Sequence, residues 1–225
     1  MSCGNGSSTE VDLVFQANFG DEILEYGKTY VQDGGVAFDI SKSDFFITDV
    51  RLTADDGTEI TLFDYAQVDF EVAPGGTRLI SDNRVNFGNY ESITMGIGLN
   101  SDLNSQKPSD FSANDILGGS SHYWTAWDSY IFSKQEGRYD SDGDGITDTG
   151  WVVHTGTDDI YEELTIQLDA SVDDENREIR LILDHEQLFI KDGVATEFGI
   201  NHNPADKESF SEYFQRLVNN ISLSN

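Results

Sequence analysis

Basic residues are scarce in this sequence. Lys and Arg number 13 against 42 Asp and Glu, which gives a formal net charge of −29 at pH 7. Proteins that bind nucleic acid neutralise phosphates with clustered Lys and Arg, so this balance excludes nucleic acid as a partner. The same scarcity excludes electrostatic attraction to an anionic membrane surface.

Proline and long apolar runs are also scarce. The chain of 225 residues has 3 Pro and no low-complexity linker, which favours one folded domain over residues 11–225. No run of 18 or more apolar residues occurs, so the sequence predicts no membrane-spanning helix. Aromatic residues make up 12% of the chain, too much large apolar surface for a disordered acidic protein.

Only one cysteine is present, Cys3, and it precedes the small polar stretch Gly4–Thr9. A disulfide within the chain is therefore excluded. A cysteine before a flexible tether is typical of a bacterial lipoprotein after its signal peptide is removed, although an incidental terminal cysteine is the simpler alternative. We expect lipidation at Cys3, a tether over residues 1–10, a periplasmic or cell-surface location, and membrane association only through the lipid.

Short runs of alternating apolar and polar residues, separated by Gly- and Asp-rich turns, predict many β-strands. These runs are 11–17, 37–40, 45–52, 59–63, 92–99, 130–134, 164–168, 178–183 and 186–189. The spacing of Phe210, Phe214, Leu217 and Val218 predicts a helix over 206–220, capped at Asn203 or Asp206. Residues 102–118 are predicted to form a long loop with a helical turn. This pattern favours an all-β fold, an antiparallel sandwich or barrel.

One loop carries a motif for metal binding. Asp140-Ser141-Asp142-Gly143-Asp144-Gly145-Ile146-Thr147-Asp148 follows the pattern D-x-D-x-D-G-x-x-D. Calcium takes six to eight oxygen ligands, and alternating carboxylates on a tight loop direct several of them at one point. We expect side-chain ligands from Asp140, Asp142 and Asp144, a carboxylate from Asp148 that binds directly or through water, and a carbonyl ligand from Ile146. Position twelve is Trp151 rather than Glu, so the loop is not an EF-hand; the alternative is a solvated acidic turn.

A second unusual segment is His122-Tyr123-Trp124-Thr125-Ala126-Trp127, which holds two of the three tryptophans. Tryptophan and tyrosine are common in the interiors of β-sandwiches, so an ordinary core role is one interpretation. The other interpretation depends on motifs elsewhere in the chain.

Five segments in order resemble the MbnP-like family of copper-binding proteins, encoded beside methanobactin genes, together with the copper-repressible surface proteins of methanotrophs. The matching segments are Phe38–Leu52, Ile97–Asn104, Tyr123–Gly137, Val153–Gly156 and the tail Phe210–Leu223. The resemblance implies a secreted antiparallel β-sandwich with long loops and a short C-terminal helix. It also implies copper binding and oxidation of a tryptophan to kynurenine by a dihaem MbnH-like enzyme, whose product offers an aromatic amine as a ligand.

By this resemblance His154 is the main candidate for a copper ligand, and Trp124, then Trp127, is the candidate for oxidation. The chain departs from the family at four points. Asn18 stands where the first-strand motif has histidine, the two tryptophans are three rather than two positions apart, Ser129 replaces the glycine before the motif tyrosine, and His122 replaces a methionine. We therefore expect His122 and Asn18 as further candidate ligands. If the loop at 140–148 joins two adjacent antiparallel strands, the segment before Tyr130 comes near the segment after Trp151, so we expect His154 to lie close to Trp124, Trp127 and Asn18.

Motifs of self-contained enzymes are absent: no G-x-S-x-G, P-loop or H-E-x-x-H occurs. We expect a monomeric lipoprotein that binds or delivers copper, is stabilised by calcium and is not an enzyme. The alternative is a calcium-dependent interaction module at the cell surface whose copper site has decayed.

Overall fold

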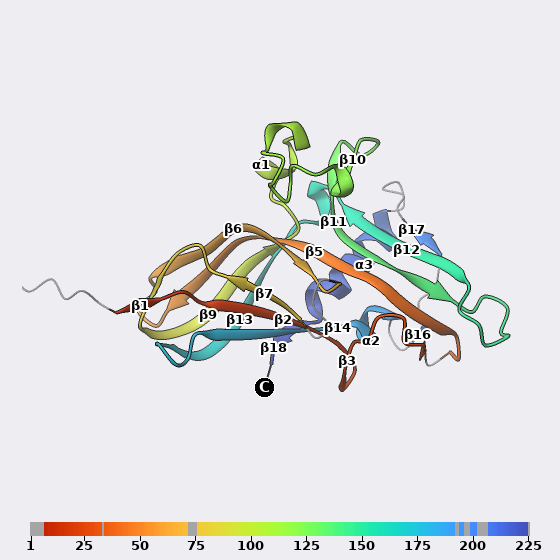
Figure 1. Ribbon diagram of the computed structural model, residues 1–225, viewed down its shortest axis with the longest axis horizontal. Coiled ribbons are helices and arrows are strands. Elements are labelled where there is room, and N and C mark those ends of the chain that lie inside the picture. Colours follow the sequence, from red (N-terminus) through yellow and green to blue (C-terminus); the bar gives the residue numbers. More distant parts are fainter. Residues whose placement is uncertain are drawn as a thin grey trace, which may run out of the picture.

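The computed structural model describes residues 7–32, 34–71, 76–191, 194–195, 199–201 and 207–224. Residues 1–6 of the predicted tether, which include Cys3, lie outside these residues, as do His202 and the predicted helix caps at Asn203 and Asp206. The described chain forms an all-β, sandwich-like fold of two main sheets with a C-terminal helix, as predicted (Figure 1). Within it, no helix is long and apolar enough to cross a membrane.

The larger sheet has nine strands and is organised around one long strand, β5. Its main path runs β13-β9-β5-β11-β12-β17, and β4, β6 and β10 pair beside it. Its strands are β4 (Tyr30–Val31), β5 (Ala37–Ala54), β6 (Glu59–Asp69), β9 (Gly88–Ile97), β10 (Tyr123–Trp124), β11 (Ser129–Tyr139), β12 (Thr149–Gly156), β13 (Glu162–Val172) and β17 (Ile200–Asn201). The first half of β5 pairs with β11 and the second half with β9.

The smaller sheet has five strands. They are β2 (Asp12–Phe19), β3 (Glu22–Ile23), β7 (Thr77–Ile80), β14 (Glu178–Asp184) and β18 (Ile221–Leu223). Strands β2 and β14 are parallel, as are β12 and β17, so the predicted antiparallel arrangement holds for most pairs and not for these two. Two short pairs lie apart: β1 (Ser8–Thr9) with β8 (Val85–Asn86), and β15 (Ile190–Lys191) with β16 (Val194–Ala195).

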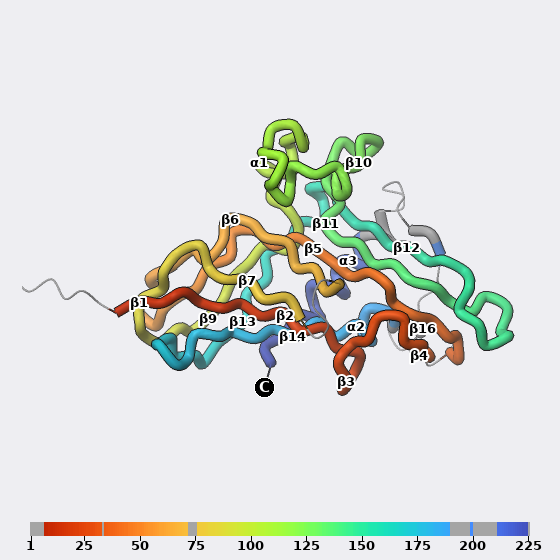
Figure 2. Tube along the Cα trace, in the orientation of Figure 1, coloured from red at the N-terminus to blue at the C-terminus, as the bar shows by residue number. Residues whose placement is uncertain are grey.

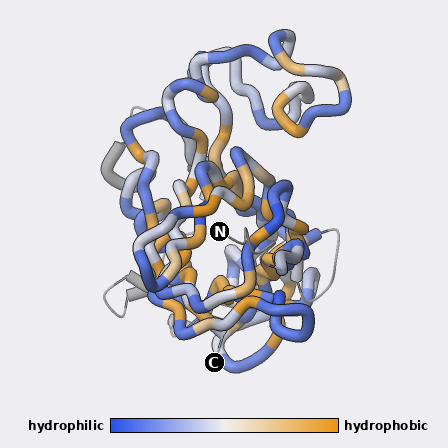
Figure 3. Tube along the Cα trace, turned by 90° about the vertical axis from the view of Figure 1, so that its left-hand side faces the viewer, coloured by the Kyte–Doolittle hydropathy of each residue, from blue (hydrophilic) through white to orange (hydrophobic). Residues whose placement is uncertain are grey.

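The core lies between the sheets. Leu13 and Phe15 of β2 are fully buried and face Phe45 of β5, whose ring lies 5.7 Å from that of Phe15. Helix α3 (Lys207–Asn219) covers part of this core with Tyr213, Phe214, Leu217 and Val218, while the side chain of Phe210 lies outside the described part. Apolar segments accordingly gather inside the molecule in the end-on view (Figure 3).

Two predicted elements differ in the structure. Residues 186–189, predicted as a strand, include most of the helical turn α2 (His185–Leu188), because the Asp184 side chain accepts a hydrogen bond from the Glu186 amide and caps it. The predicted strands 37–40 and 45–52 belong to one strand. The intervening residues are polar, but Ser43 and Asp44 are fully buried and pair with β11.

Residues 98–128 leave the larger sheet between β9 and β11 and form a projecting lobe (Figures 1 and 3). The lobe holds the helical turn α1 (Ser101–Asn104) and two 3-10 turns, Pro108–Asp110 and Ser120–His122, which confirms the predicted loop with a helical turn. Another 3-10 turn, Asp158–Ile160, follows β12. Asn104 ties the lobe to the sheet, since its side chain bonds the Tyr130 amide and Asp158.

Candidate metal-binding site

The candidate site is built on the hairpin of β11 and β12. The sequence predicted that the acidic loop would join two antiparallel strands, and this is confirmed: residues 140–148 form the tip of the hairpin (Figure 2). In the observed register Lys134 of β11 stands opposite His154 of β12. On the other side of β11, Lys134 pairs with Asp44 of β5. A row of polar residues therefore crosses three strands on one face of the sheet.

The two tryptophans are arranged by a tight turn. Strand β10 pairs with the start of β11, and the Trp127 amide donates to the Trp124 carbonyl at 3.0 Å. The three-residue spacing thus places both residues at the ends of a β-turn. Their indole rings stack with centroids 4.9 Å apart and planes inclined by 9°. Asp128 holds the turn from outside, because it accepts hydrogen bonds from Lys107 and the Tyr123 hydroxyl.

His154 lies beside this pair, as the sequence predicted. The centroids of the His154 and Trp124 rings are 6.3 Å apart and the rings meet edge to face. His154 Nε2 lies 2.8 Å from Glu136 Oε1. An ionised carboxylate can only accept, so Nε2 donates this bond, and in the neutral imidazole the ring lone pair then lies on Nδ1. Metal-binding histidines are commonly oriented by such a carboxylate.

An open pocket of about 560 Å³ adjoins these residues. It is lined by Ser121, Tyr123, Trp124, Thr125, Ala126, Ile131, Lys134 and His154. Lys134 is only 8% exposed, and burial lowers the pKa of its ammonium. That ammonium donates a hydrogen bond to the Ser121 carbonyl, so the lobe and the sheet meet at this wall of the pocket.

His122, the second predicted ligand, does not line the pocket. Its Nε2 lies 2.9 Å from Asp44 Oδ1 and its Nδ1 lies 3.2 Å from Ser121 Oγ. Burial opposes ionisation of Asp44, but hydrogen bonds and charges from His122 and Lys42 together lower the pKa of its carboxyl. His122 thus holds the buried Asp44 carboxylate beneath the lobe.

Asn18, the third predicted ligand, lies near the end of β2 in the smaller sheet, whereas His154 belongs to the larger one. Its side chain accepts a hydrogen bond from Gln16 at 2.7 Å, and its residue pairs with Asp184. The neighbouring histidine is His185, which is fully buried, with Nε2 2.7 Å from Ser43 Oγ. The structure therefore brings His154, Trp124 and Trp127 together but does not add Asn18 to them.

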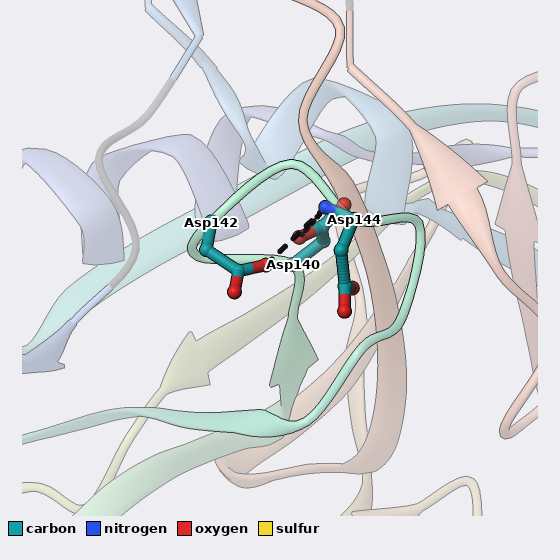
Figure 4. Close-up of side chains that lie close together, drawn as sticks. All are labelled: Asp140, Asp142 and Asp144. Carbon is teal, nitrogen blue, oxygen red and sulfur yellow. Dashed lines mark hydrogen bonds between the residues drawn. The ribbon is translucent and has the colours of Figure 1, made fainter.

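The acidic loop gathers three carboxylates. One oxygen from each of Asp140, Asp142 and Asp144 lies within 4.8 Å of the others (Figure 4). Asp140 accepts hydrogen bonds from the backbone amides of Gly143 and Gly145 at 2.7 and 2.8 Å. The bond from Gly145 has the largest effect, and together these bonds lower the pKa of the Asp140 carboxyl.

The carboxylate of Asp148 does not join these three, and the predicted carbonyl ligand from Ile146 stays a prediction. Asp148 instead accepts a hydrogen bond from the Thr149 hydroxyl. The Ile146 amide donates to Asp144, and its side chain is 60% exposed.

Three residues of the site were missed in the sequence: Asp44, Lys134 and Glu136. Their signal is a short alternation: Lys134 and Glu136 stand two positions apart in β11, and Lys42 and Asp44 stand two positions apart in β5. Alternation identifies that face, but it does not show that the lobe covers it.

Comparisons with known proteins agree with this fold. The structure of MbnP from Methylosinus trichosporium superposes with a TM-score of 0.59 and 13% sequence identity, over 86% of this chain and 80% of that one. No curated protein sequence matches the chain. The sequence model of the MbnP family matches residues 8–208, the greater part of the chain. The chain therefore belongs to the MbnP family.

Proposed function

We propose that this protein is an extracytoplasmic copper-binding protein whose metal site lies in the open pocket beside His154. The observation that carries the proposal is the contact of His154 with Trp124 on the wall of that pocket, where Trp124 stacks on Trp127. Imidazole nitrogen suits copper, and Glu136 holds the ring in the tautomer that places the lone pair on Nδ1.

The proposal depends on His154 more than on the other predicted ligands. His122 already bonds Asp44 and Ser121 through both ring nitrogens, so it would have to give up one of these contacts to bind a metal. Asn18 lies in the other sheet. Oxidation of Trp124, or of Trp127, to kynurenine by a dihaem MbnH-like partner would add an aryl amine beside His154. Intact mass of protein from its native host would reveal this change, because one carbon is replaced by one oxygen.

Competitive titration of copper(I) against a chelator tests the site. We expect His154→Ala to lose orders of magnitude in affinity, since few donors remain to complete the coordination. Glu136→Gln should lose about 10- to 100-fold, the usual effect of removing an orienting carboxylate. His122→Gln should retain affinity and serves as the histidine control. Equal affinities of wild type and His154→Ala would favour the alternative, a calcium-dependent interaction module at the cell surface.

Calcium at the hairpin tip is the second part of the proposal. Three converging carboxylates repel one another, and a divalent ion held by them would offset that repulsion. The loop joins β11 to β12, so ordering it would stabilise the register that sets Lys134 opposite His154. An extracytoplasmic protein anchored through lipid at Cys3 is consistent with calcium as a structural ion.

Melting curves with calcium and with EDTA test this part. A ligand at a hundredfold excess over its Kd adds about 2.7 kcal/mol, which raises the Tm of a domain of this size by about 5 °C or more. Asp142→Ala and Asp144→Ala should abolish the rise. Asp174→Ala changes an exposed aspartate in another turn and should keep it. An unchanged wild-type curve in EDTA would refute the calcium proposal.

A further inference from the structure

The pocket beside His154 contains a buried cation whose charge is not balanced by an ion pair. The Lys134 side chain is 8% exposed and donates to the Ser121 carbonyl, a neutral acceptor. Throughout the described part of the chain, no carboxylate forms an ion pair with its ammonium. This is unexpected in a protein with 42 acidic residues, because burying an unpaired charge is costly.

The carboxylates nearest to Lys134 are engaged by other groups. Asp44 is held by Lys42 at 2.9 Å and by His122 at 2.9 Å. Glu136 is held by His154 at 2.8 Å. Each of these acids thus has its own partner, and the Lys134 ammonium is the cation in excess on this face of the sheet.

The rest of the pocket wall is mixed: apolar and aromatic side chains make up about half of it, and Ser121, Thr125 and His154 supply polar groups. Trp124, Tyr123, Ile131 and Ala126 line it, and the indole of Trp124 is fixed by stacking on Trp127. A volume of about 560 Å³ falls in the range of small-molecule sites. Such sites combine an apolar, aromatic wall with a few polar groups that set the orientation of the ligand.

We propose that this pocket binds a small aromatic carboxylate, with the carboxylate paired to the Lys134 ammonium and the ring packed against Trp124. The carboxylate supplies the missing counter-charge, and a charge-assisted hydrogen bond in a partly buried site is among the stronger polar contacts. The aromatic ring matches the tryptophan wall. The site requires no metal, so this inference and the copper proposal stand or fall separately.

The test uses the copper-free protein and two probes of nearly the same shape, 4-nitrobenzoate and the neutral 4-nitrobenzamide. Nitroaromatic compounds quench tryptophan fluorescence. Trp151 is 1% exposed, so saturable quenching reports on Trp124 and Trp127. We expect 4-nitrobenzoate to bind saturably and about tenfold or more tightly than the amide, the difference that one charged hydrogen bond supplies.

Variants assign the effect to Lys134. Lys134→Met should reduce the affinity for 4-nitrobenzoate to that for the amide and leave the amide unchanged, whereas Lys134→Arg should retain the preference for the acid. Lys28→Met removes a lysine paired with Glu22 elsewhere on the surface and should have no effect. Removing an unpaired buried charge should not lower the Tm, which checks that Lys134→Met is folded.

Equal affinity of wild-type protein for the acid and the amide would overturn the inference, and that result needs no variant. Equal affinity of wild type and Lys134→Met for 4-nitrobenzoate would overturn it as well. Loss of copper binding in His154→Ala with anion binding intact would leave both proposals standing. Anion binding without any copper binding would remove the copper proposal alone.

Discussion

The buried His185 should make this protein sensitive to mild acid. Its side chain is fully buried at the start of α2, within hydrogen-bond distance of Ser43 Oγ and the Leu183 carbonyl. The Phe70 ring packs against it with centroids 5.6 Å apart. Burial lowers the pKa of His185 from 6.5 to about 4. The folded protein therefore resists a proton that the unfolded chain accepts.

The direction and size of the effect follow from this difference. Between pH 6.5 and about 4 the unfolded chain binds more protons at this residue, so the free energy of unfolding falls as the pH falls through that window. At about 1.4 kcal/mol per pKa unit, His185 alone lowers the free energy of unfolding by about 3 kcal/mol by the lower end of this pH window. Above about pH 7 the imidazole is neutral in both states and the contribution is complete.

Urea denaturation of wild type and His185→Gln, in EDTA and at several pH values across this window, measures the effect. Glutamine keeps an amide that can bond Ser43 but cannot take up a proton. Carboxylates titrate in both proteins, so their contribution cancels in the difference between the two stabilities. We expect the free energy of unfolding of wild type, relative to that of the variant, to fall by about 3 kcal/mol as the pH is lowered to about 4. Parallel pH dependences would refute the assignment of a depressed pKa to His185.

Two further predictions concern the scaffold of the site. Gly98→Ala should cost about 2 kcal/mol or more in urea denaturation, because Gly98 has φ +94° and an added Cβ would meet Phe132 Cδ2 at 2.4 Å. Gly57→Ala has a similar φ of +82° but open space, so it should cost only about 1 kcal/mol; equal losses would contradict the steric explanation. Asp44→Ala should destabilise by about 3 kcal/mol, since it leaves Lys42 and His122 without their shared carboxylate, and a loss below about 1 kcal/mol would show that this pairing contributes little.

The sequence by itself determined the elements whose signal is local. Alternation along 11–17, 130–134 and 178–183 predicted strands that the structure contains, and the spacing within 206–220 predicted α3. The hairpin around the acidic loop also followed from sequence, because a short turn-rich loop between two strands favours antiparallel pairing. The alternation of apolar and polar residues is a property of neighbouring residues, so the sequence alone is enough to detect it.

Tertiary structure decided the contacts between distant segments. Local alternation at 186–189 indicated a strand, but the structure has the turn α2 there, with His185 and Leu188 fully buried in the core. Asn18 matched a motif position of the family, yet pairing of β2 with β14 placed it beside Asp184 instead of His154. Lys134 has the sequence pattern of an exposed strand residue, but in the folded protein the lobe covers it at Ser121. Strand order and the path of a long loop depend on the packing of the whole chain, and these two features decide which charges are buried in the pocket.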